Sequence, residues 1–217
     1  MNEHPKGNMK NTMMQSVITS VLILLSTNIF GFPIEFITSD QIITPELSSR
    51  AIIRREAGFE RDFLILHCLV KKIAPKNLFE VGTCQGYGTL IITNACPACQ
   101  VISLDLPPNS PPFFLKPSDV GSKCINSYLQ VFGDSLTYDY ARHFPIDAWF
   151  IDGAHDYEHV KFETEQAVSS DAILIVYHDT DIPEVLSAIT DVLTTTEYKI
   201  YRITDSRISY AIKIDFE

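Results

Sequence analysis

Positive charge is in short supply in this sequence. Its 17 lysine and arginine residues are outnumbered by 27 aspartate and glutamate residues, which gives a formal net charge of −10 and a pI near 5.0. Binding to nucleic acid needs a concentrated positive surface that neutralises phosphates. We therefore expect no nucleic-acid partner.

Cysteine is also scarce, and the cysteines lack the spacing of a disulfide framework. The five cysteines are an odd number without regular spacing, which is typical of a reducing compartment rather than of a disulfide scaffold. The single CxxC motif joins Cys96 and Cys99, but a zinc site needs about four ligands and no second pair exists. We therefore expect a structural role for this pair and a cytoplasmic location for the protein.

No apolar run is long enough to cross a membrane. The stretch "VITSVLILL" at residues 17–25 extends to residue 32 only with polar interruptions, whereas a spanning helix needs ~20 apolar residues. Lysines precede it, as in secretory signals, but no clear cleavage site follows. Two interpretations of residues 10–32 stay open: a buried or peripheral helix, which we favour, and a signal or membrane anchor that would associate the N-terminus with a membrane.

What the sequence does have is a pattern of alternating strands and helices. A length of 217 residues with 46% hydrophobic residues suits an ordinary globular domain. Residues 1–59 are expected to form an N-terminal helical extension and residues 60–217 a catalytic domain. Helical spacing runs over residues 45–72 until Pro75 ends it.

Five short apolar runs predict buried strands, with helices between them. The strands are expected at residues 78–81, 100–106, 127–133, 147–152 and 171–179, and the helices at 87–95, 157–168 and 182–193. Such alternation is typical of a parallel sheet with right-handed crossovers. Residues 197–203 and 207–214, joined by "TDS", predict an antiparallel hairpin. The predicted fold is therefore α/β, a doubly wound, mostly parallel seven-stranded sheet with an antiparallel C-terminal hairpin.

A proline-rich segment follows the second strand. Residues 107–124 contain five of the twelve prolines, so they are expected to form a long loop. Loops of this length in compact domains are often lids or binding segments. Phe113 and Phe114 in this loop either close over a substrate or pack on the sheet edge, and the sequence does not separate these interpretations.

Three glycines follow the first predicted strand in "NLFEVGTCQGYGT". Gly82, Gly86 and Gly88 lie where a doubly wound sheet binds ligands, at the carboxyl end of a strand. Their spacing, G-x-x-x-G-x-G, differs from the G-x-G-x-x-G of dinucleotide-binding enzymes. A glycine-rich turn can also be a tight connection without a ligand, so the motif needs support from its neighbours.

Acidic residues at successive strand ends give that support. Glu80 sits inside the first apolar strand, where an unpaired carboxylate is costly, so it needs a hydrogen-bond donor. Asp105 ends the second strand, about 20 residues further on, where a carboxylate can bind both ribose hydroxyls. Asp134 and Asp152 follow the third and fourth strands. Each acid alone has an ordinary structural interpretation, but the series favours a nucleoside-type ligand.

A second group of polar residues follows the fourth and fifth strands, in "IDGAHDYEHVK" and "VYHDT". One hypothesis is that Asp152, His178 and Asp179 hold a divalent ion of the magnesium type, which lowers the pKa of a substrate hydroxyl. Another is that His155 or His178 acts as a general base beside Asp152. Both routes generate a nucleophilic oxygen, and the absence of any catalytic role stays open as a third. His159, one helical turn beyond His155, is expected to be solvated and inert.

These stretches together resemble the class I S-adenosylmethionine-dependent methyltransferases. The residues that carry the likeness are "FEVGTCQGYGT", "SLDLP", "FGDS", "AWFIDGAHDYEHV" and "LIVYHDT", from about Asn77 onward. It is strongest to small-molecule O-methyltransferases whose fourth strand ends in an Asp-Gly-x-His-x-Tyr stretch. The resemblance implies S-adenosylmethionine as cofactor, held by Glu80, Gly82, Thr83, Gly86, Asp105, Gly133, Asp134, Ser135 and Asp152.

The resemblance also implies O-methylation of a small-molecule or glycan hydroxyl, with a homodimer as an open expectation. After the fifth strand the family has an aspartate followed by an asparagine, whereas this sequence has His178 followed by Asp179. This difference leaves the magnesium ion in doubt. A non-catalytic S-adenosylmethionine-binding protein therefore stays open as an alternative. A nicotinamide-dependent oxidoreductase is a weaker one, because the dinucleotide motif is missing.

Overall fold

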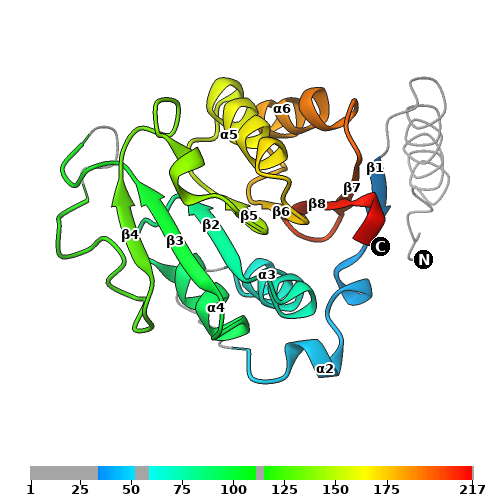
Figure 1. The fold of residues 1–217 in the computed structure, drawn as a ribbon. Helices are drawn as coiled ribbons and strands as arrows, with labels where there is room; N and C mark the ends of the chain where they lie inside the picture. Colours follow the sequence, from blue (N-terminus) through cyan, green and yellow to red (C-terminus); the bar gives the residue numbers. More distant parts are fainter. Residues whose placement is uncertain (1–33, 52–58, 111–114, 217) are drawn as a thin grey trace, which may run out of the picture. The chain divides into compact units, whose positions relative to one another are not determined.

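The computed structural model describes residues 34–51, 59–110 and 115–216 (Figure 1). The interpretations of residues 10–32 and of Phe113 and Phe114 lie outside the described residues. The compact unit to which the described elements belong begins at Glu35, earlier than the boundary expected at residue 59. Within the described ranges, no helix has both the length and the apolar character of a membrane span.

The predicted doubly wound sheet is confirmed, with one strand more than expected. The strands are β1 (Ile34–Ile37), β2 (Asn77–Val81), β3 (Gln100–Asp105), β4 (Leu129–Phe132), β5 (Ala148–Ile151), β6 (Leu174–Tyr177), β7 (Tyr198–Ile203) and β8 (Ser209–Lys213). Their order in the sheet is β1-β7-β8-β6-β5-β2-β3-β4. Strands β2 to β6 pair in parallel, while β8 pairs antiparallel with both β6 and β7. The C-terminal hairpin is therefore part of the sheet, as predicted.

In the described part of the expected helical N-terminal extension, residues 34–51, the structure has a strand as well as helical turns. β1 lies beside β7, and the backbone N–H of Thr204 donates to the carbonyl oxygen of Ile37 at 2.9 Å. A short 3₁₀ turn, η1 (Ser39–Gln41), and the four-residue helix α2 (Pro45–Ser48) follow. Ile37 and Ile42 are buried in the main core, so this segment belongs to the domain that follows it.

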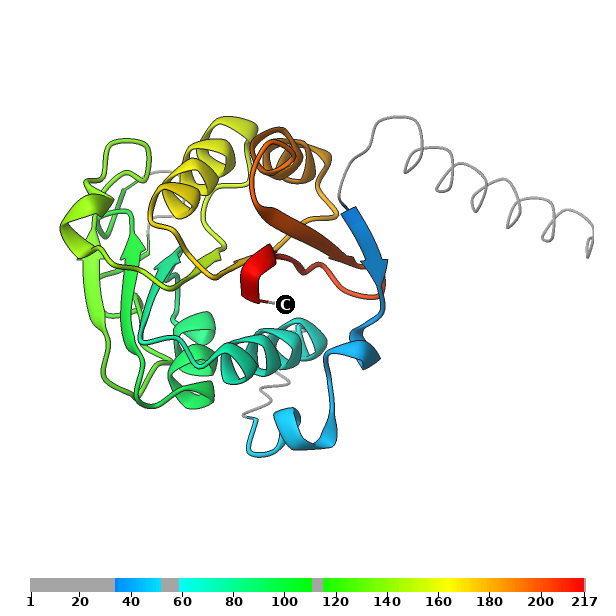
Figure 2. The ribbon, with the colours of Figure 1, turned by 45° about the vertical axis from the view of Figure 1, so that its right-hand side comes forward.

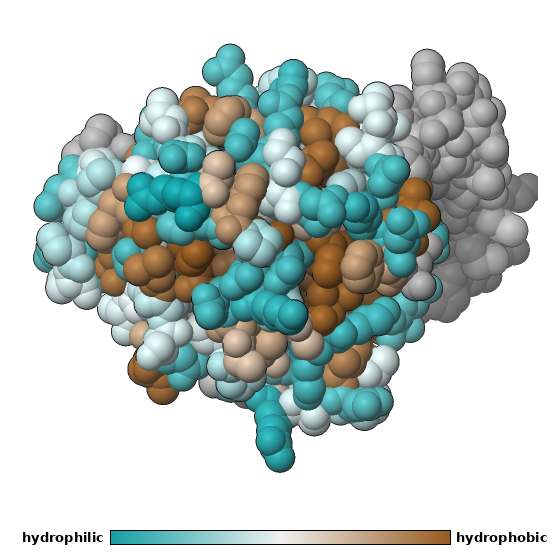
Figure 3. Space-filling view, viewed as in Figure 1, coloured by the Kyte–Doolittle hydropathy of each residue, from teal (hydrophilic) through white to brown (hydrophobic). Residues whose placement is uncertain are grey.

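Helices cover both faces of the sheet (Figures 1 and 2). α3 (Glu60–Ile73) and α4 (Tyr87–Ala95) lie on one face, and α5 (Tyr157–Ser169) and α6 (Pro183–Leu193) on the other. This double cover explains why β5 and β6 are apolar throughout, since every residue of both strands is buried. α3 ends at Ala74, which has a left-handed backbone directly before Pro75. On the surface, hydrophobic patches are interrupted by hydrophilic side chains (Figure 3).

The path of the chain creates a switch point between β2 and β5. From β2 the chain moves outward through β3 and β4, and then returns to β5 on the opposite side of β2. In open α/β sheets the ligand crevice lies outside the carboxyl ends of the strands at such a point. The residues after Val81 and Ile151 are therefore the place to look for a site.

Candidate active site

The glycine turn after β2 is crowded by the chain's own backbone. Gly82 has a φ of +96°, and a Cβ atom there would overlap the carbonyl oxygen of Asp152, which follows β5. Gly86 caps α4 with a φ of +85°, and its Cβ would come within 2.8 Å of the Cα of Gly121. Only glycine accepts this combination of conformation and contact. The turn is thus fixed against the loops that follow β3 and β5.

Glu80 lies beneath the turn rather than at its surface. Its side chain is fully buried, and its Oε2 accepts hydrogen bonds from the hydroxyls of Thr89 and Ser103, each at 2.5 Å. A Cβ on Gly88 would lie 2.5 Å from Oε1, so that glycine lets α4 pack over the carboxyl group. Burial raises the pKa of Glu80 to about 8, although the two hydroxyl hydrogen bonds lower it. Glu80 therefore carries a proton at neutral pH and supports the turn from below.

Thr83 belongs to the same buried network. Its hydroxyl lies 2.5 Å from the hydroxyl of Ser103 and accepts a hydrogen bond from Nε2 of Gln130 at 2.9 Å. Gln130 is on β4, so this network ties the turn after β2 to the strand two places away in the sheet. The sequence does not predict this link, because Gln130 belongs to none of the motifs that indicate the site.

Asp105 meets the glycine turn directly. Its Oδ2 accepts a hydrogen bond from the backbone N–H of Cys84 at 2.6 Å, and its Oδ1 accepts one from Leu106 at 2.7 Å. Burial raises the pKa of Asp105, and these two backbone donors counteract the rise. A cavity of about 10 Å³, the volume of roughly one water molecule, lies beside the carboxylate against residues 106–108, 110, 115 and 120. The acid predicted to hold a ribose is therefore in place next to the turn.

The end of β4 lies next to Asp105. The backbone N–H of Gly133 donates to the carbonyl oxygen of Asp105 at 3.0 Å, and the exposed carboxylate of Asp134 follows. His159 of α5 approaches Oδ1 of Asp134 at 4.0 Å and also contacts Asp156 at 2.8 Å. His159 was expected to be solvated and inert. In the structure it lies near two carboxylates, and one of them is at the end of β4. The carbonyl oxygen of Ser135 accepts a hydrogen bond from the hydroxyl of Tyr140 at 3.1 Å.

A polar cluster gathers at the ends of β5 and β6. Nδ1 of His178 lies 3.1 Å from Oδ1 of Asp152 and 3.2 Å from Oδ2 of Asp179. Nε2 of His155 lies 3.0 Å from the same oxygen of Asp179 and 3.9 Å from Oδ1 of Asp152. The structure therefore brings together the four residues that the sequence placed at two neighbouring strand ends. His178 is buried, whereas the side chain of His155 is 37% exposed.

Two members of this cluster are not evident from the sequence motifs. Asp62, in the first turn of α3, accepts a hydrogen bond from Nε2 of His178 at 3.3 Å. Arg207, in the turn between β7 and β8, donates its backbone N–H to Asp62 at 3.2 Å and places Nη1 2.6 Å from Oδ1 of Asp179. The sequence could have indicated that Asp62 is buried, because it shares a helical face with the buried residues Leu66 and Leu69. Arg207 gives no comparable signal.

The carboxylates control the protonation of the imidazoles. Burial lowers the pKa of His178, but Asp152, Asp179 and Asp62 around the ring outweigh it and raise the pKa to about 11. Asp152 and Asp179 raise the pKa of His155 to about 9. Burial disfavours ionisation of Asp179, yet the two imidazoles hold its pKa well below the ordinary value. In this arrangement both histidines are protonated at neutral pH, so neither is ready to accept a proton.

The cluster does not match the preferences of magnesium. Mg²⁺ favours octahedral sites built from oxygen ligands and keeps several of its waters. Here imidazole nitrogens alternate with carboxylate oxygens, and Arg207 already holds one oxygen of Asp179. The arrangement therefore gives no support to the expected magnesium ion on Asp152, His178 and Asp179.

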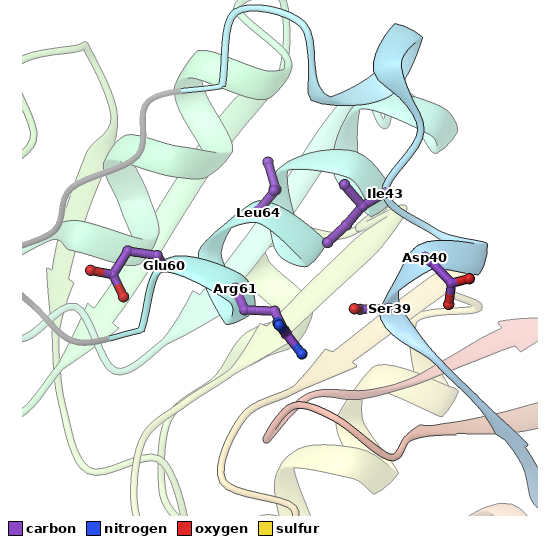
Figure 4. Close-up of a pocket in the computed structure, with 6 residues that line it drawn as sticks. All are labelled: Ser39, Asp40, Ile43, Glu60, Arg61 and Leu64. Atoms are coloured by element: carbon purple, nitrogen blue, oxygen red, sulfur yellow. The ribbon is translucent and has the colours of Figure 1, made fainter.

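A separate hollow lies between η1 and the first turns of α3. It has a volume of about 350 Å³ and is lined by Ser39, Asp40, Ile43, Glu60, Arg61 and Leu64 (Figure 4). Arg61 forms an ion pair with Asp205 at 2.6 Å beside it. None of the predicted site residues lines this hollow, so it plays no part in the candidate site.

Comparison with known proteins supports a methyltransferase. A family model described as a methyltransferase domain, Methyltransf_24, matches residues 79–180, from β2 to the end of β6. This span contains the glycine turn, Asp105 and most of the polar cluster. No curated protein matches the sequence significantly.

Solved structures share the fold at low sequence identity. Cofactor-bound Rv0187 from MTB is 19% identical, with a TM-score of 0.54, covering 89% of this chain and 95% of that protein. The O-methyltransferase from Bacillus cereus in complex with SAH is 14% identical, with a TM-score of 0.53 and coverages of 77% and 85%. The O-methyltransferase TomG from Streptomyces achromogenes in complex with SAM is 14% identical, with a TM-score of 0.55 and coverages of 79% and 90%. The chain thus has the Rossmann-like methyltransferase fold.

Proposed function

We propose that this protein is an S-adenosylmethionine-dependent methyltransferase that acts on a hydroxyl group of a small molecule or a glycan. The observation that carries the proposal is the hydrogen bond between the carboxylate of Asp105 and the backbone N–H of Cys84. It joins a strand-end acid to the glycine turn at the switch point, where nucleoside ligands bind in this class of fold. The match of residues 79–180 to a methyltransferase domain supports the same conclusion.

The residues at the switch point fit a nucleoside cofactor. A carboxylate has about four lone-pair sites, and the two backbone donors on Asp105 leave capacity for two ribose hydroxyls. Asp134 and Ser135, at the end of the neighbouring strand, would lie toward the base. Gly82, Thr83 and Gly86 would border the amino-acid part, with Glu80 holding the turn from beneath. S-adenosylmethionine would supply an electrophilic methyl group at this place.

The polar cluster adjoins the turn and would receive the acceptor. Asp152 follows β5, and its backbone packs against Gly82, so a group bound at Asp152 is next to the turn. Asp152 and His155 are more exposed than the other aspartates and histidine of the cluster, and His178 is buried. A substrate hydroxyl would therefore meet Asp152 and His155. Holding the hydroxyl oxygen in line with the methyl group would supply much of the rate acceleration.

A non-catalytic binding protein is the second candidate. The contact between Arg207 and Asp179 favours it, because the guanidinium group pairs with an acid that was expected to hold a metal ion. Under this proposal the turn would still bind the cofactor, while the cluster would have only a structural role.

Calorimetric titration with S-adenosylhomocysteine, S-adenosylmethionine and NAD tests the proposal. We expect binding of the two sulfur nucleosides and none of NAD; tight NAD binding alone would point to an oxidoreductase. A screen for transfer of isotope-labelled methyl groups to phenols, catechols and sugars then separates the two candidates. Asp152→Ala should abolish transfer, and calorimetry of this variant shows how much Asp152 contributes to nucleoside binding.

A further inference from the structure

β4 is an edge strand whose two faces are poorly covered. It lies at the end of the sheet and pairs only with β3 among the described strands (Figure 1). The described parts of the connections on either side, residues 106–110, 115–128 and 133–147, contain turns and the 3₁₀ turn η3 (Tyr140–His143) but no α-helix. All four residues of β4 are therefore at least partly exposed, whereas those of β5 and β6 are buried. The two faces and the outer edge of β4 are open to a partner.

Large apolar side chains are exposed along and beside this strand. The exposed fraction is 52% for Leu129, 45% for Phe132 and 82% for Ile125, in the loop before β4. Because side chains alternate along a strand, Leu129 and Phe132 point to opposite faces of the sheet. A helix packed on one face would cover only one of them. A strand added beside β4 would contact both and would also pair with its open backbone edge.

The segment around β4 lacks most of the features that keep edge strands from pairing. Natural edges are commonly protected by charged side chains, by proline or by short length. Residues 124–133, "CINSYLQVFG", contain neither a charged residue nor a proline, and only the length of four residues limits the pairing of β4. An exposed apolar edge of this kind is a template for another strand.

The absence of charge favours a second copy of this chain as the partner. With a net charge of −10, two copies repel each other on average, but this uncharged segment lets them meet without opposing like charges. A two-fold axis is the commonest symmetry of homo-oligomers and aligns the two edge strands antiparallel. With Gln130 at the axis, Leu129 of each copy would lie opposite Val131 of the other. Tyr128 would likewise lie opposite Phe132, and such apolar and aromatic cross-strand pairs stabilise sheets.

We infer that two copies of this protein associate edge to edge through β4, so that their sheets continue into one another. The pairing would also reach the candidate site, because Gln130 on β4 donates hydrogen bonds to the hydroxyl of Thr83 and to the carbonyl oxygen of Ser103. Fixing β4 would thereby hold the turn after β2 in place. The inference stands on the surface of β4 and does not depend on the proposed methyl transfer.

Sedimentation equilibrium of the full-length protein tests this inference without measuring activity. Over a series of rising concentrations we expect the mass to change from that of one chain, 24.5 kDa, to twice that value and to stop there. Hydrogen exchange of the backbone amides of residues 129–132 should slow over the same range of concentration. A mass of one chain at every concentration, or amide exchange in β4 that does not change as the dimer forms, would overturn the inference.

Variants assign the association to β4. Leu129→Lys and Phe132→Lys each place like charges near the two-fold axis and should weaken the dimer by about tenfold or more. Ile214→Lys is the matched control, because it introduces the same charge at an apolar side chain that is 54% exposed outside β4, and it should leave the dimer unchanged. Circular dichroism shows whether each variant is folded. A dimer that persists in folded Leu129→Lys and Phe132→Lys, or that dissociates in Ile214→Lys, contradicts the assignment.

Discussion

A Cβ atom on Gly82 would lie only 2.1 Å from the carbonyl oxygen of Asp152. The turn after β2 and the loop after β5 therefore touch through their backbones, and the φ of +96° at Gly82 adds a second reason for glycine. Any larger residue must push these two loops apart. This contact joins the expected cofactor turn to the polar cluster.

Gly82→Ala should destabilise the protein by about 3–5 kcal/mol, since it combines a strained backbone with an overlap that the neighbouring backbone cannot relieve. Gly153→Ala is the control: its Cβ would come within 3.0 Å of only a methyl group of Val81, and it should cost about 1 kcal/mol. Urea unfolding of both variants gives the comparison. Equal losses would show that the contact at Gly82 is not the cause.

Asp105→Asn should weaken binding of S-adenosylhomocysteine by about 10- to 100-fold, because hydrogen bonds to a charged group contribute about 1.5–3 kcal/mol. The amide oxygen can still accept the N–H of Cys84, so the turn should keep its shape. Isothermal titration calorimetry measures the affinity. Asp139→Asn, at an exposed acid after β4, should bind the ligand as the unmodified protein does; unchanged affinity in Asp105→Asn would remove this residue from the site.

Glu80 should make the protein less stable as the pH rises. Its pKa is about 8 in the folded protein, against an ordinary value of 4.5, so between these values the folded state binds more protons than the unfolded state. Its contribution is therefore fully present below pH 4.5 and is lost as the pH rises toward 8, at up to about 1.4 kcal/mol per pH unit.

Glu80→Gln removes this titration and should flatten the pH dependence. The amide oxygen can still accept the hydroxyl hydrogen bonds of Thr89 and Ser103. Denaturant unfolding at pH 5, 6, 7 and 8 would follow the difference between the two proteins. A constant difference across this range would mean that Glu80 is ionised in the folded protein.

Arg207→Ala should lower stability by about 2 kcal/mol, because Asp62 and Asp179 lose the guanidinium group that contacts both of them. The loss is smaller than for a fully buried pair, since the side chain of Arg207 is 32% exposed. A double-mutant cycle with Asp62→Asn isolates the interaction between the two residues. Additive losses would show that Arg207 stabilises the hairpin without pairing with Asp62.

The sequence predicts the sheet well because its strands are short apolar runs that end in acids. β2, β3, β5 and β6 occur within a few residues of their expected positions, and the hairpin of β7 and β8 follows from its turn. β1 is missed because "IEFI" is only four residues long. Its place depends on an edge of the sheet that the chain forms some 160 residues later, beside Thr204.

The candidate site is predictable only where its residues follow strands. Asp105, Asp152, His178 and Asp179 share one rim because parallel strands end at the same edge. The sequence does not show that Glu80 faces α4 instead of the rim, since that depends on the contact of Gly88 with its carboxyl group. Asp62 and Arg207 enter the cluster from a helix start and a hairpin turn, through contacts between residues 145 positions apart.

The turn between β7 and β8 also determines when the cluster is completed during synthesis. The ribosome makes Asp62 and Asp179 before it reaches Arg207, so the parallel strands can assemble while these two acids still lack their guanidinium partner. Only when the last hairpin inserts next to β6 does that partner arrive. A nascent chain stalled before this hairpin would therefore hold an unbalanced negative centre, and release of the hairpin would be the step that closes the domain.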